Sequence, residues 1–186
     1  GIDRKQFNPG RRSEAFRAAH NIRPDDVAVA FLGRLVLEKG LDVFADAVEA
    51  ADARGAGLKI LVIGEGPARG WFKERLPDAC FTGELTGTDL ATALASADVF
   101  LNPSVTESFG NVTLEAMACA LPVVAARASG ATSLVQDGRT GTLAEPGAID
   151  EYAAALCAYA ADPALRAKHG AAGLAFAETM DWDEIN

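Results

Sequence analysis

The sequence has few cysteines and no long apolar run, and each shortage excludes a class of protein. The three cysteines, Cys80, Cys119 and Cys157, are far apart and odd in number, which excludes a disulfide framework and a CxxC metal site. No apolar run approaches the roughly 20 residues of a membrane helix, and no basic segment followed by an apolar one opens the chain. We therefore expect a protein of the reducing cytosol whose three cysteines are buried as small apolar side chains.

Positive charge is also scarce. The chain has 17 Lys and Arg against 26 Asp and Glu, which gives a formal net charge of -9. A nucleic-acid surface needs clustered Lys and Arg to neutralise phosphates, so we expect no nucleic-acid partner. Any cations gathered for a phosphate ligand would be a local exception in this acidic chain.

The sequence does contain a regular alternation of apolar, β-branched stretches with helical ones. Stretches of strand length are residues 27–33, 58–64, 80–83, 98–102 and 121–126. Helix formers at helical spacing occupy residues 41–54, 67–76, 89–96, 112–120, 150–161 and 164–176. This alternation predicts an α/β fold, a doubly wound, Rossmann-like parallel sheet with helices on both faces. Ligands of such sheets bind beyond the carboxyl ends of the strands.

A length of 186 residues fits a single domain, residues 1–186. Residues 1–12 are polar and include Pro9 and Gly10, so we expect them to be the remnant of an interdomain linker. At the other end, Asp181 is a candidate helix cap with little chain after it. Both ends suggest a partner domain that this chain does not contain.

The most informative stretch is residues 106–118, TESFGNVTLEAMA. It follows a predicted strand and passes from a loop containing Glu107 into a helix containing Glu115. A helix N-terminus in this position presents unpaired amides and a positive dipole end, so a phosphate could bind there without a metal. Alternatively, Glu107 or Ser108 only caps the helix and Glu115 is solvated, an equally common pattern.

The second stretch is residues 33–40, GRLVLEKG, which also follows a strand and precedes a helix. Arg34 can donate to two phosphate oxygens at once, and Lys39 supplies a compact point charge. A glycine-bounded loop with two cations at the carboxyl edge of the sheet therefore suits a diphosphate. The alternative is a surface loop in which Glu38 and Lys39 pair with each other.

Together the two stretches resemble the large retaining glycosyltransferase family 4, which has the GT-B fold. Weaker matches follow the family's order at residues 62–67 (VIGEGP), 81–83 (FTG) and 121–125 (LPVVA), and the opening GID resembles the start of the family's second domain. The chain departs from the family at Ala120, where a glycine is usual. The resemblance thus implies the C-terminal, donor-binding half of a GT-B enzyme, without its acceptor-binding first domain.

The resemblance implies a sugar-binding role for the loop before the helix. Glu107 would contact hydroxyls of the transferred sugar. The backbone amides of Phe109, Gly110 and Asn111 would assist it. These residues match the family's motif one by one.

The resemblance also implies how the nucleotide is held. The amides of Val112 and Thr113 would meet the diphosphate, and Glu115 would hold the ribose hydroxyls. Arg34 and Lys39 would neutralise the leaving diphosphate. Fixed cations and helix amides aimed at that growing charge stabilise the transition state more than the ground state.

Two further positions complete the implied donor site. Gly33 opens the cationic loop, and backbone near Leu85 would read the base. The implied function is transfer of a sugar from a UDP- or GDP-linked donor to a glycan or lipid-linked acceptor, with no cofactor and no metal. The Gly-Asn-Val variant at residues 110–112 is similar to mannosyl- and sulfoquinovosyl-transferring members. We expect the fragment alone to be inactive and the whole enzyme to be cytoplasmic or peripheral at the inner membrane face.

Two alternative functions stay open. One is another GT-B enzyme acting on nucleotide sugars, such as an epimerase. The other is a receiver-like signalling module, which would need a cluster of acidic residues at the strand ends. Instead, the predicted strand ends present glycines, Asn102 and Arg127.

Several motifs have simpler interpretations than catalysis. Residues 64–70, GEGPARG, follow the second strand with the wrong glycine spacing for a dinucleotide site, and Pro67 favours a helix start. Residues 181–183 spell the metal-binding D-x-D pattern but favour a helix cap. We expect His20 and His169 to have surface or packing roles, and Trp71 with Phe72 to belong to the core and its margin.

Overall fold

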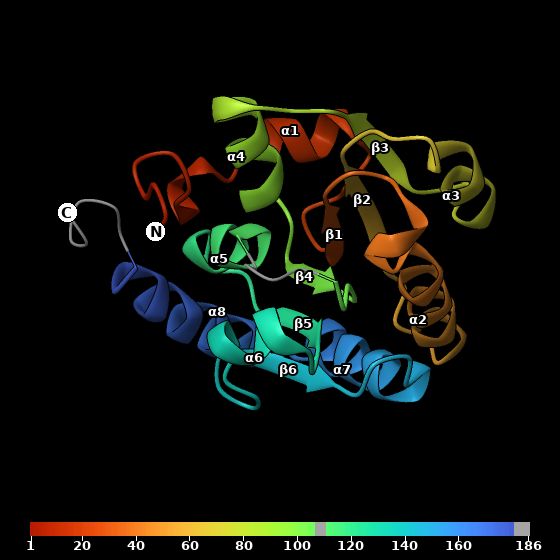
Figure 1. The fold of residues 1–186 in the computed structure, drawn as a ribbon. Coiled ribbons are helices and arrows are strands. Elements are labelled where there is room, and N and C mark those ends of the chain that lie inside the picture. The colour runs from red at the N-terminus through yellow and green to blue at the C-terminus, as the bar shows by residue number, and fades with distance from the viewer. Residues whose placement is uncertain (107–110, 181–186) are drawn as a thin grey trace.

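A computed structural model describes residues 1–106 and 111–180. In these residues one parallel sheet has the strand order β3-β2-β1-β4-β5-β6 (Figure 1). The chain builds outward from β1 to β3, returns to the other side of β1 with β4, and continues outward to β6. The strand order therefore reverses between β1 and β4, which is where ligands bind in such sheets.

The predicted fold class is confirmed, and the described helices and strands alternate along most of the chain. In order they are η1 (Pro9–Arg11), α1 (Glu14–Ala19), β1 (Ala28–Leu32), η2 (Leu37–Lys39), α2 (Leu41–Ala53), β2 (Lys59–Ile63), α3 (Arg69–Arg75), β3 (Cys80–Gly83), α4 (Gly87–Ala95), β4 (Val99–Asn102), α5 (Asn111–Ala118), β5 (Val123–Ala126), α6 (Ser129–Leu134), β6 (Gly141–Ala144), α7 (Ile149–Ala161) and α8 (Pro163–Glu178).

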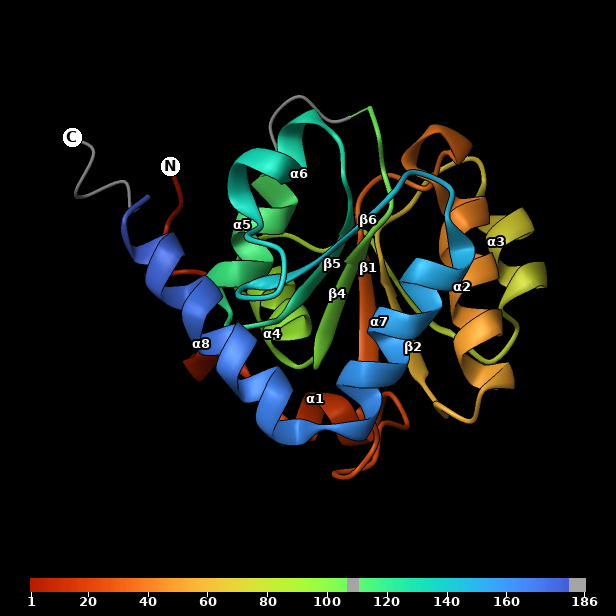
Figure 2. The same ribbon diagram turned by 90° about the horizontal axis from the view of Figure 1, so that it is seen from below.

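Helices cover both faces of the sheet (Figures 1 and 2). Helices α2, α3 and α7 pack on one face, and α4 and α5 pack on the other together with the N-terminal segment and the end of α8. Strand residues alternate between the faces: Val29 and Phe31 belong to the first core, whereas Ala28 and Ala30 belong to the second. Because both faces are buried, the strands are apolar throughout instead of alternating with polar residues.

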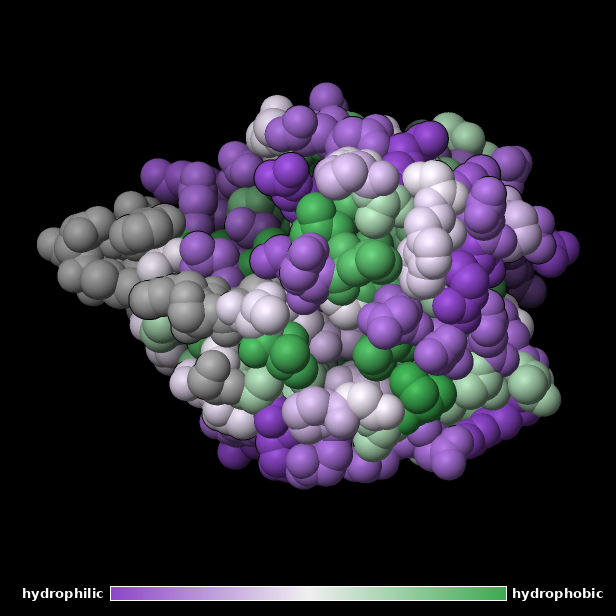
Figure 3. All heavy atoms as spheres, turned by 45° about the vertical axis from the view of Figure 1, so that its right-hand side comes forward, coloured by the Kyte–Doolittle hydropathy of each residue, from purple (hydrophilic) through white to green (hydrophobic). Residues whose placement is uncertain are grey.

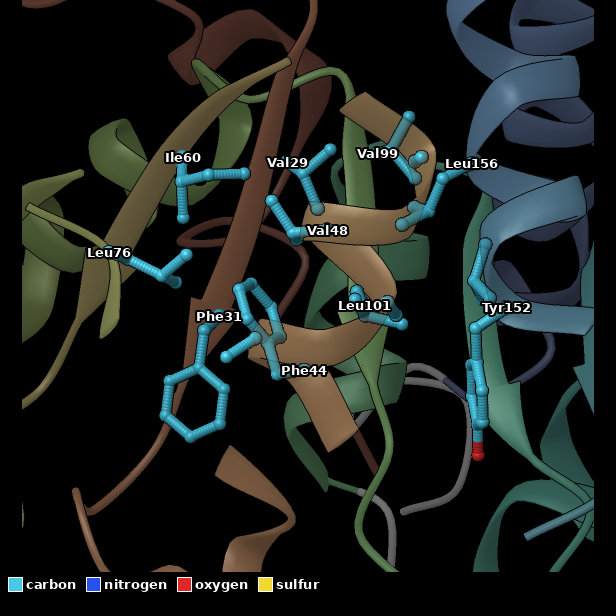
Figure 4. Packing of buried hydrophobic residues seen from close by; sticks show 14 of the residues in the cluster. Val29, Phe31, Phe44, Val48, Ile60, Leu76, Val99, Leu101, Tyr152 and Leu156 are labelled. Atoms are coloured by element: carbon cyan, nitrogen blue, oxygen red, sulfur yellow. The ribbon is translucent and has the colours of Figure 1, made fainter. Parts of the chain in front are cut away.

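The first core is built from aromatic rings that meet edge to face. The rings of Phe31, Phe44 and Phe72 lie 5.6–5.9 Å apart between centroids, from β1, α2 and α3. Helix α2 presents Phe44 and Val48 to the sheet, four residues apart and thus on one face (Figure 4). Such ring pairs add stability beyond their buried area, so the strands that precede the loops of interest are held rigidly.

The amino edge of the sheet is closed by a buried arginine. The guanidinium of Arg17, on α1, donates to the Ser96 carbonyl (2.8 Å) and to Asp98 Oδ2 (3.0 Å). It also donates to the carbonyls of Arg23 (2.8 Å) and Asp26 (2.9 Å). This fully buried side chain therefore ties the N-terminal helix to the starts of β1 and β4.

The structure adds to the expectations about the ends and the gaps of the chain. Residues 1–12, expected to be a linker remnant, pack on the domain: Ile2 and Phe7 are buried, and the Ile2 amide donates to the Met180 carbonyl at 2.9 Å. Helix α1, helix α6 and strand β6 had not been predicted. The candidate cap Asp181 lies outside the described residues.

Some side-chain expectations also change. Cys119 is buried as expected, but Cys80 and Cys157 are partly exposed, so the expectation for those two was wrong. Pro67 is not the first residue of a helix, since α3 begins at Arg69. The packing role expected of His169 is confirmed: its Nδ1 lies 2.7 Å from the buried Tyr159 hydroxyl, between α8 and α7.

Candidate functional site

The site begins with glycines that join the ends of three strands. The Gly33 amide donates to the Ile63 carbonyl at 3.1 Å, and the Gly64 amide donates to the Gly83 carbonyl at 3.0 Å. A Cβ added to Gly64, whose φ is +147°, would lie 1.9 Å from the Gly33 carbonyl oxygen. No side chain fits there, so only glycine lets the turns after β1 and β2 lie against each other.

The loop after β1 is fixed in a way that exposes Arg34. The Leu35 amide donates to the Glu65 carbonyl (3.0 Å), and the Leu35 carbonyl accepts from the Ala68 amide (2.8 Å). The Leu35 side chain is fully buried, so its neighbour Arg34 is directed outward and is exposed. The local backbone thus presents a cation at the carboxyl edge of the sheet.

A cavity of about 450 Å³ lies at this edge. It extends over the ends of β1, β2 and β3 and brings together three predicted site residues, Gly33, Arg34 and Leu85. Its complete lining is Leu32, Gly33, Arg34, Ile63, Gly64, Glu65, Gly66, Glu84 and Leu85. A hollow of this size, with apolar walls and a few polar groups, is typical of a small-molecule site.

The second part of the site is centred on Asn102, which ends β4. Its side-chain amide donates to Thr113 Oγ1 at 3.0 Å, and its Oδ1 accepts from the Ser104 amide at 3.2 Å. The Ser104 hydroxyl lies 3.2 Å from the Thr106 hydroxyl, which donates to the Glu38 carbonyl at 3.5 Å. We call these four side chains, Asn102, Ser104, Thr106 and Thr113, the polar relay. It links helix α5, the end of β4 and the loop after β1.

The two sequence stretches singled out above therefore meet at one edge of the sheet. Figure 2 shows the loops after β1 and β4 leaving from the same end of the strands. Their backbones also touch directly, since a Cβ on Gly40 would lie 3.1 Å from Pro103. The loops that carry the two stretches thus lie side by side at the carboxyl edge of the sheet.

Helix α5 begins at Asn111, so Asn111, Val112 and Thr113 form its first turn. Amides in a first turn have no partner inside the helix. The Thr113 side chain itself is fully buried and holds Asn102, which leaves only its backbone for a ligand. The described start of α5 therefore lies at the end of β4.

Glu115, on α5, has a carboxyl pKa that the fold shifts from its ordinary value. It is partly buried on α5, and this burial raises the pKa of its carboxyl from 4.5 to about 7. The cause is loss of hydration of the charged form. A partner that donates hydrogen bonds to the carboxylate would reverse the effect. Glu115 does not line the cavity.

Other predicted residues are placed differently or fall outside the description. Lys39 ends η2 and is partly buried, but neither it nor the first turn of α5 lines the cavity that contains Arg34. Glu107, Phe109 and Gly110 lie outside the described residues. In the part of the chain that the structure describes, no group of three or more His, Cys, Asp or Glu side chains is arranged to hold a metal ion.

Sequence reasoning missed three residues of this region: Asn102, Glu65 and Glu84. Asn102 had a visible signal, because it is a polar residue at the end of an otherwise apolar strand. Glu65 and Glu84 each follow a strand-ending glycine, which places them at the carboxyl edge. Their gathering in one cavity needed the sheet order β3-β2-β1.

On the face shown in Figure 3, hydrophobic residues lie in small groups separated by hydrophilic ones. Among the residues that the structure describes, the large exposed apolar ones are Leu37 in η2 and Val105 after β4, each 52% exposed. No helix in residues 1–106 or 111–180 is long and apolar enough to cross a membrane.

Known proteins are similar to this chain in both sequence and fold. A GDP-mannose-dependent alpha-mannosyltransferase of Corynebacterium glutamicum is 32% identical over the whole chain, which covers 44% of that relative. The C-terminal domain of the glycosyl transferase group 1 protein LpcC of Francisella tularensis superposes with a TM-score of 0.83 at 25% identity, with 96% of this chain and 97% of that one covered.

A third likeness is to a structure solved with ligands. Anabaena HepE in complex with UDP and glucose matches with a TM-score of 0.83 and 25% identity, over the whole chain and 52% of HepE. The chain spans less than half the length of the curated relatives it matches. The family model of the glycosyl transferases group 1 covers residues 26–162. The chain therefore belongs to the glycosyl transferases group 1, and its parallel sheet is that of a GT-B domain and not of a receiver-like module.

Proposed function

We propose that this chain is the donor-binding domain of a retaining, metal-independent glycosyltransferase of family 4. The observation that carries the proposal is the polar relay, which fixes the N-terminus of α5 beside the loop that presents Arg34. A cation and a set of helix amides are thereby held at one edge of the sheet. Both are groups that bind phosphate oxygens.

This arrangement suits the chemistry of a nucleoside diphosphate as leaving group. When the bond between sugar and phosphate breaks, negative charge grows on the diphosphate and the sugar becomes oxocarbenium-like. Arg34, Lys39 and the amides of Val112 and Thr113 would stabilise that charge without reorganising. A protein whose own cations do this work does not require a divalent metal.

The other parts of the donor, the ribose, the base and the transferred sugar, have their own proposed partners. Glu115 would accept hydrogen bonds from the ribose hydroxyls, and Leu85 would meet the base in the cavity. Glu107, with the amides of Phe109 and Gly110, would hold the transferred sugar. The donors that we propose to try first are UDP- and GDP-sugars. The named dependence of the Corynebacterium relative on GDP-mannose and the UDP bound to Anabaena HepE support that choice.

A partner domain would supply the acceptor, a glycan or a lipid-linked sugar, and would close the site against water. Alone, this domain would bind the donor and not transfer it. We place the whole enzyme in the cytoplasm or at the inner face of the membrane. An epimerase of the same fold would use the same donor site, so the acceptor distinguishes the two activities.

The test is calorimetric titration of the chain with UDP and GDP in EDTA. We expect binding of both, and we expect Arg34→Ala combined with Lys39→Ala to weaken it about tenfold to a hundredfold, since charge-assisted bonds to phosphate are lost. Binding of the matching nucleosides, which lack phosphates, should change little.

A charge-matched control separates this site effect from net charge. Arg54 and Lys168 are exposed cations outside the cavity, and replacing both with Ala alters the net charge equally. The control should bind like the wild type. Absence of nucleotide binding by the wild type, or a strict requirement for magnesium, would refute the proposal.

A further inference from the structure

The two ends of the cavity over β1, β2 and β3 lie at different distances from β4. Arg34 follows β1, the strand next to β4, whereas Glu84 and Leu85 follow β3, two strands further from β4. A diphosphate held near Arg34 and the α5 N-terminus therefore leaves the β3 end for another part of the ligand. In a nucleotide, that part is the base.

The lining of the cavity also suits a flat ring. Leu32 and Leu85, both partly exposed, contribute apolar walls, and Gly33, Gly64 and Gly66 contribute backbone without side chains. Two of these glycines leave no room for a side chain: a Cβ would lie 1.9 Å from the Gly33 carbonyl oxygen at Gly64 and 2.5 Å from the Leu35 carbonyl oxygen at Gly66. Apolar walls bury the faces of a base, while its edge needs hydrogen-bonding partners.

Two carboxylates border this space, and they differ. Glu65 is already engaged, because its Oε1 accepts from the Gly66 amide at 3.1 Å and its Oε2 lies 3.7 Å from Arg69 Nε. Glu84 has no hydrogen bond or ion pair within residues 1–106 and 111–180. Its side chain is thus the acceptor at the β3 end of the cavity that remains available to a ligand.

A carboxylate only accepts hydrogen bonds, and its two oxygens suit two adjacent donors. Guanine presents such a pair in its ring N1–H and exocyclic N2 amine. Uracil presents a single N3–H between two carbonyl oxygens, which a carboxylate repels. Hypoxanthine keeps the N1–H of guanine but lacks the N2 amine.

We propose that Glu84 selects guanine, so that the donor of this domain is a GDP-sugar. The inference rests on the proposed function, since it assumes that the cavity holds the base of a nucleoside diphosphate. The carboxylate would accept from both guanine donors while the glycine backbones enclose the ring. Leu85 meets the base beside it.

The experiment is calorimetric titration of the 186-residue chain with GDP, IDP and UDP, in EDTA. We expect GDP to bind roughly tenfold more tightly than UDP, with IDP between them, because one well-formed pair of hydrogen bonds discriminates bases by about that factor or more. Glu84→Gln should remove most of the preference for GDP, because the Gln amide can donate to a uracil carbonyl and accept from N3–H.

Glu65→Gln is the matched control in the same cavity, and it should keep the wild-type ratio of GDP to UDP affinity. Far-UV circular dichroism and thermal unfolding confirm that each variant is folded. Equal binding of GDP and UDP by the wild type, or an unchanged ratio in Glu84→Gln, overturns the inference while the proposed function stands. Failure of every nucleoside diphosphate to bind overturns both.

Discussion

Charged side chains are buried and paired at the amino edge of the sheet, but exposed or only partly buried at its carboxyl edge. At the amino edge, Arg17 is fully buried, and its two terminal nitrogens donate to Asp98 and to three carbonyls. At the carboxyl edge, Arg34 is exposed and lines an open cavity. Glu115, on the helix that begins there, is partly buried with a pKa raised to about 7.

The difference separates groups that stabilise the fold from groups that await a ligand. A buried charge that several groups hold contributes to structure, and removing it leaves those groups uncompensated. A charge without partners contributes little to the fold, or opposes it, until a ligand arrives. Variants at the two edges should therefore divide between stability and binding.

The largest expected effect is at the amino edge. Arg17→Met keeps the apolar stem but removes the cation from Asp98 and four hydrogen bonds. We expect the free energy of unfolding to fall by about 3 kcal/mol, because three carbonyls lose a donor and Asp98 keeps, among the described residues, only Arg12 and the Ala28 amide as partners. Urea denaturation followed by circular dichroism measures this change.

The matched variant at the other edge is Arg34→Met. It should change the free energy of unfolding by no more than about 0.5 kcal/mol, as is usual at exposed positions, while it weakens nucleoside diphosphate binding. Similar loss of stability in both variants would contradict the distinction between the edges.

The second effect is a pH dependence at Glu115. Because the pKa is about 7 in the folded chain and 4.5 is its ordinary value, the folded state holds a proton that the unfolded state has released between these pH values. Stability should therefore fall as pH rises from about 4.5 to 7 and stay low above it. Glu115→Gln should remove this decline and be more stable than the wild type at pH 8, by roughly 2 kcal/mol.

Thermal unfolding of the wild type and Glu115→Gln between pH 4.5 and 8 tests this effect, with the difference between the two as readout. His169, whose pKa burial lowers, contributes equally to both proteins and cancels. Parallel curves would show that Glu115 titrates normally. With GDP or UDP bound, hydroxyl donors to the carboxylate should favour its charged form, so binding near pH 7 should release protons.

The smallest effect concerns strain at the amino edge. Ala120, just after α5, has a φ of +60°, in the left-handed region that favours glycine. Ala120→Gly should raise the free energy of unfolding by about 0.5 to 1 kcal/mol. The opposite change, Gly170→Ala, should lower it, since the added Cβ would lie 2.2 Å from the Ala120 carbonyl oxygen. Guanidinium denaturation distinguishes the two signs, and a loss in Ala120→Gly would contradict the assignment of strain.

Most of the sheet could be predicted because its strands are buried on both faces. Residues 58–64 and 80–83 are short apolar runs that glycines end, and they became β2 and β3 with shifts of at most one residue. Strand β6 could not be found in this way, because Gly141–Ala144 has one β-branched residue and one large apolar one. It is a strand only because β5 offers a free edge for pairing.

The sequence by itself determined the residue types at the strand ends, namely the glycines that the tight turns require and the Arg34 cation. It also determined that a helix follows β4. The chemistry of these residues is local, so spacing reveals it. Only the tertiary structure decided which of them meet. The order β3-β2-β1-β4 set Glu84 and Arg34 around one cavity, and Asn102 joined α5 to the neighbouring loop. Those contacts depend on strand pairing between distant segments, which no local pattern of residues encodes.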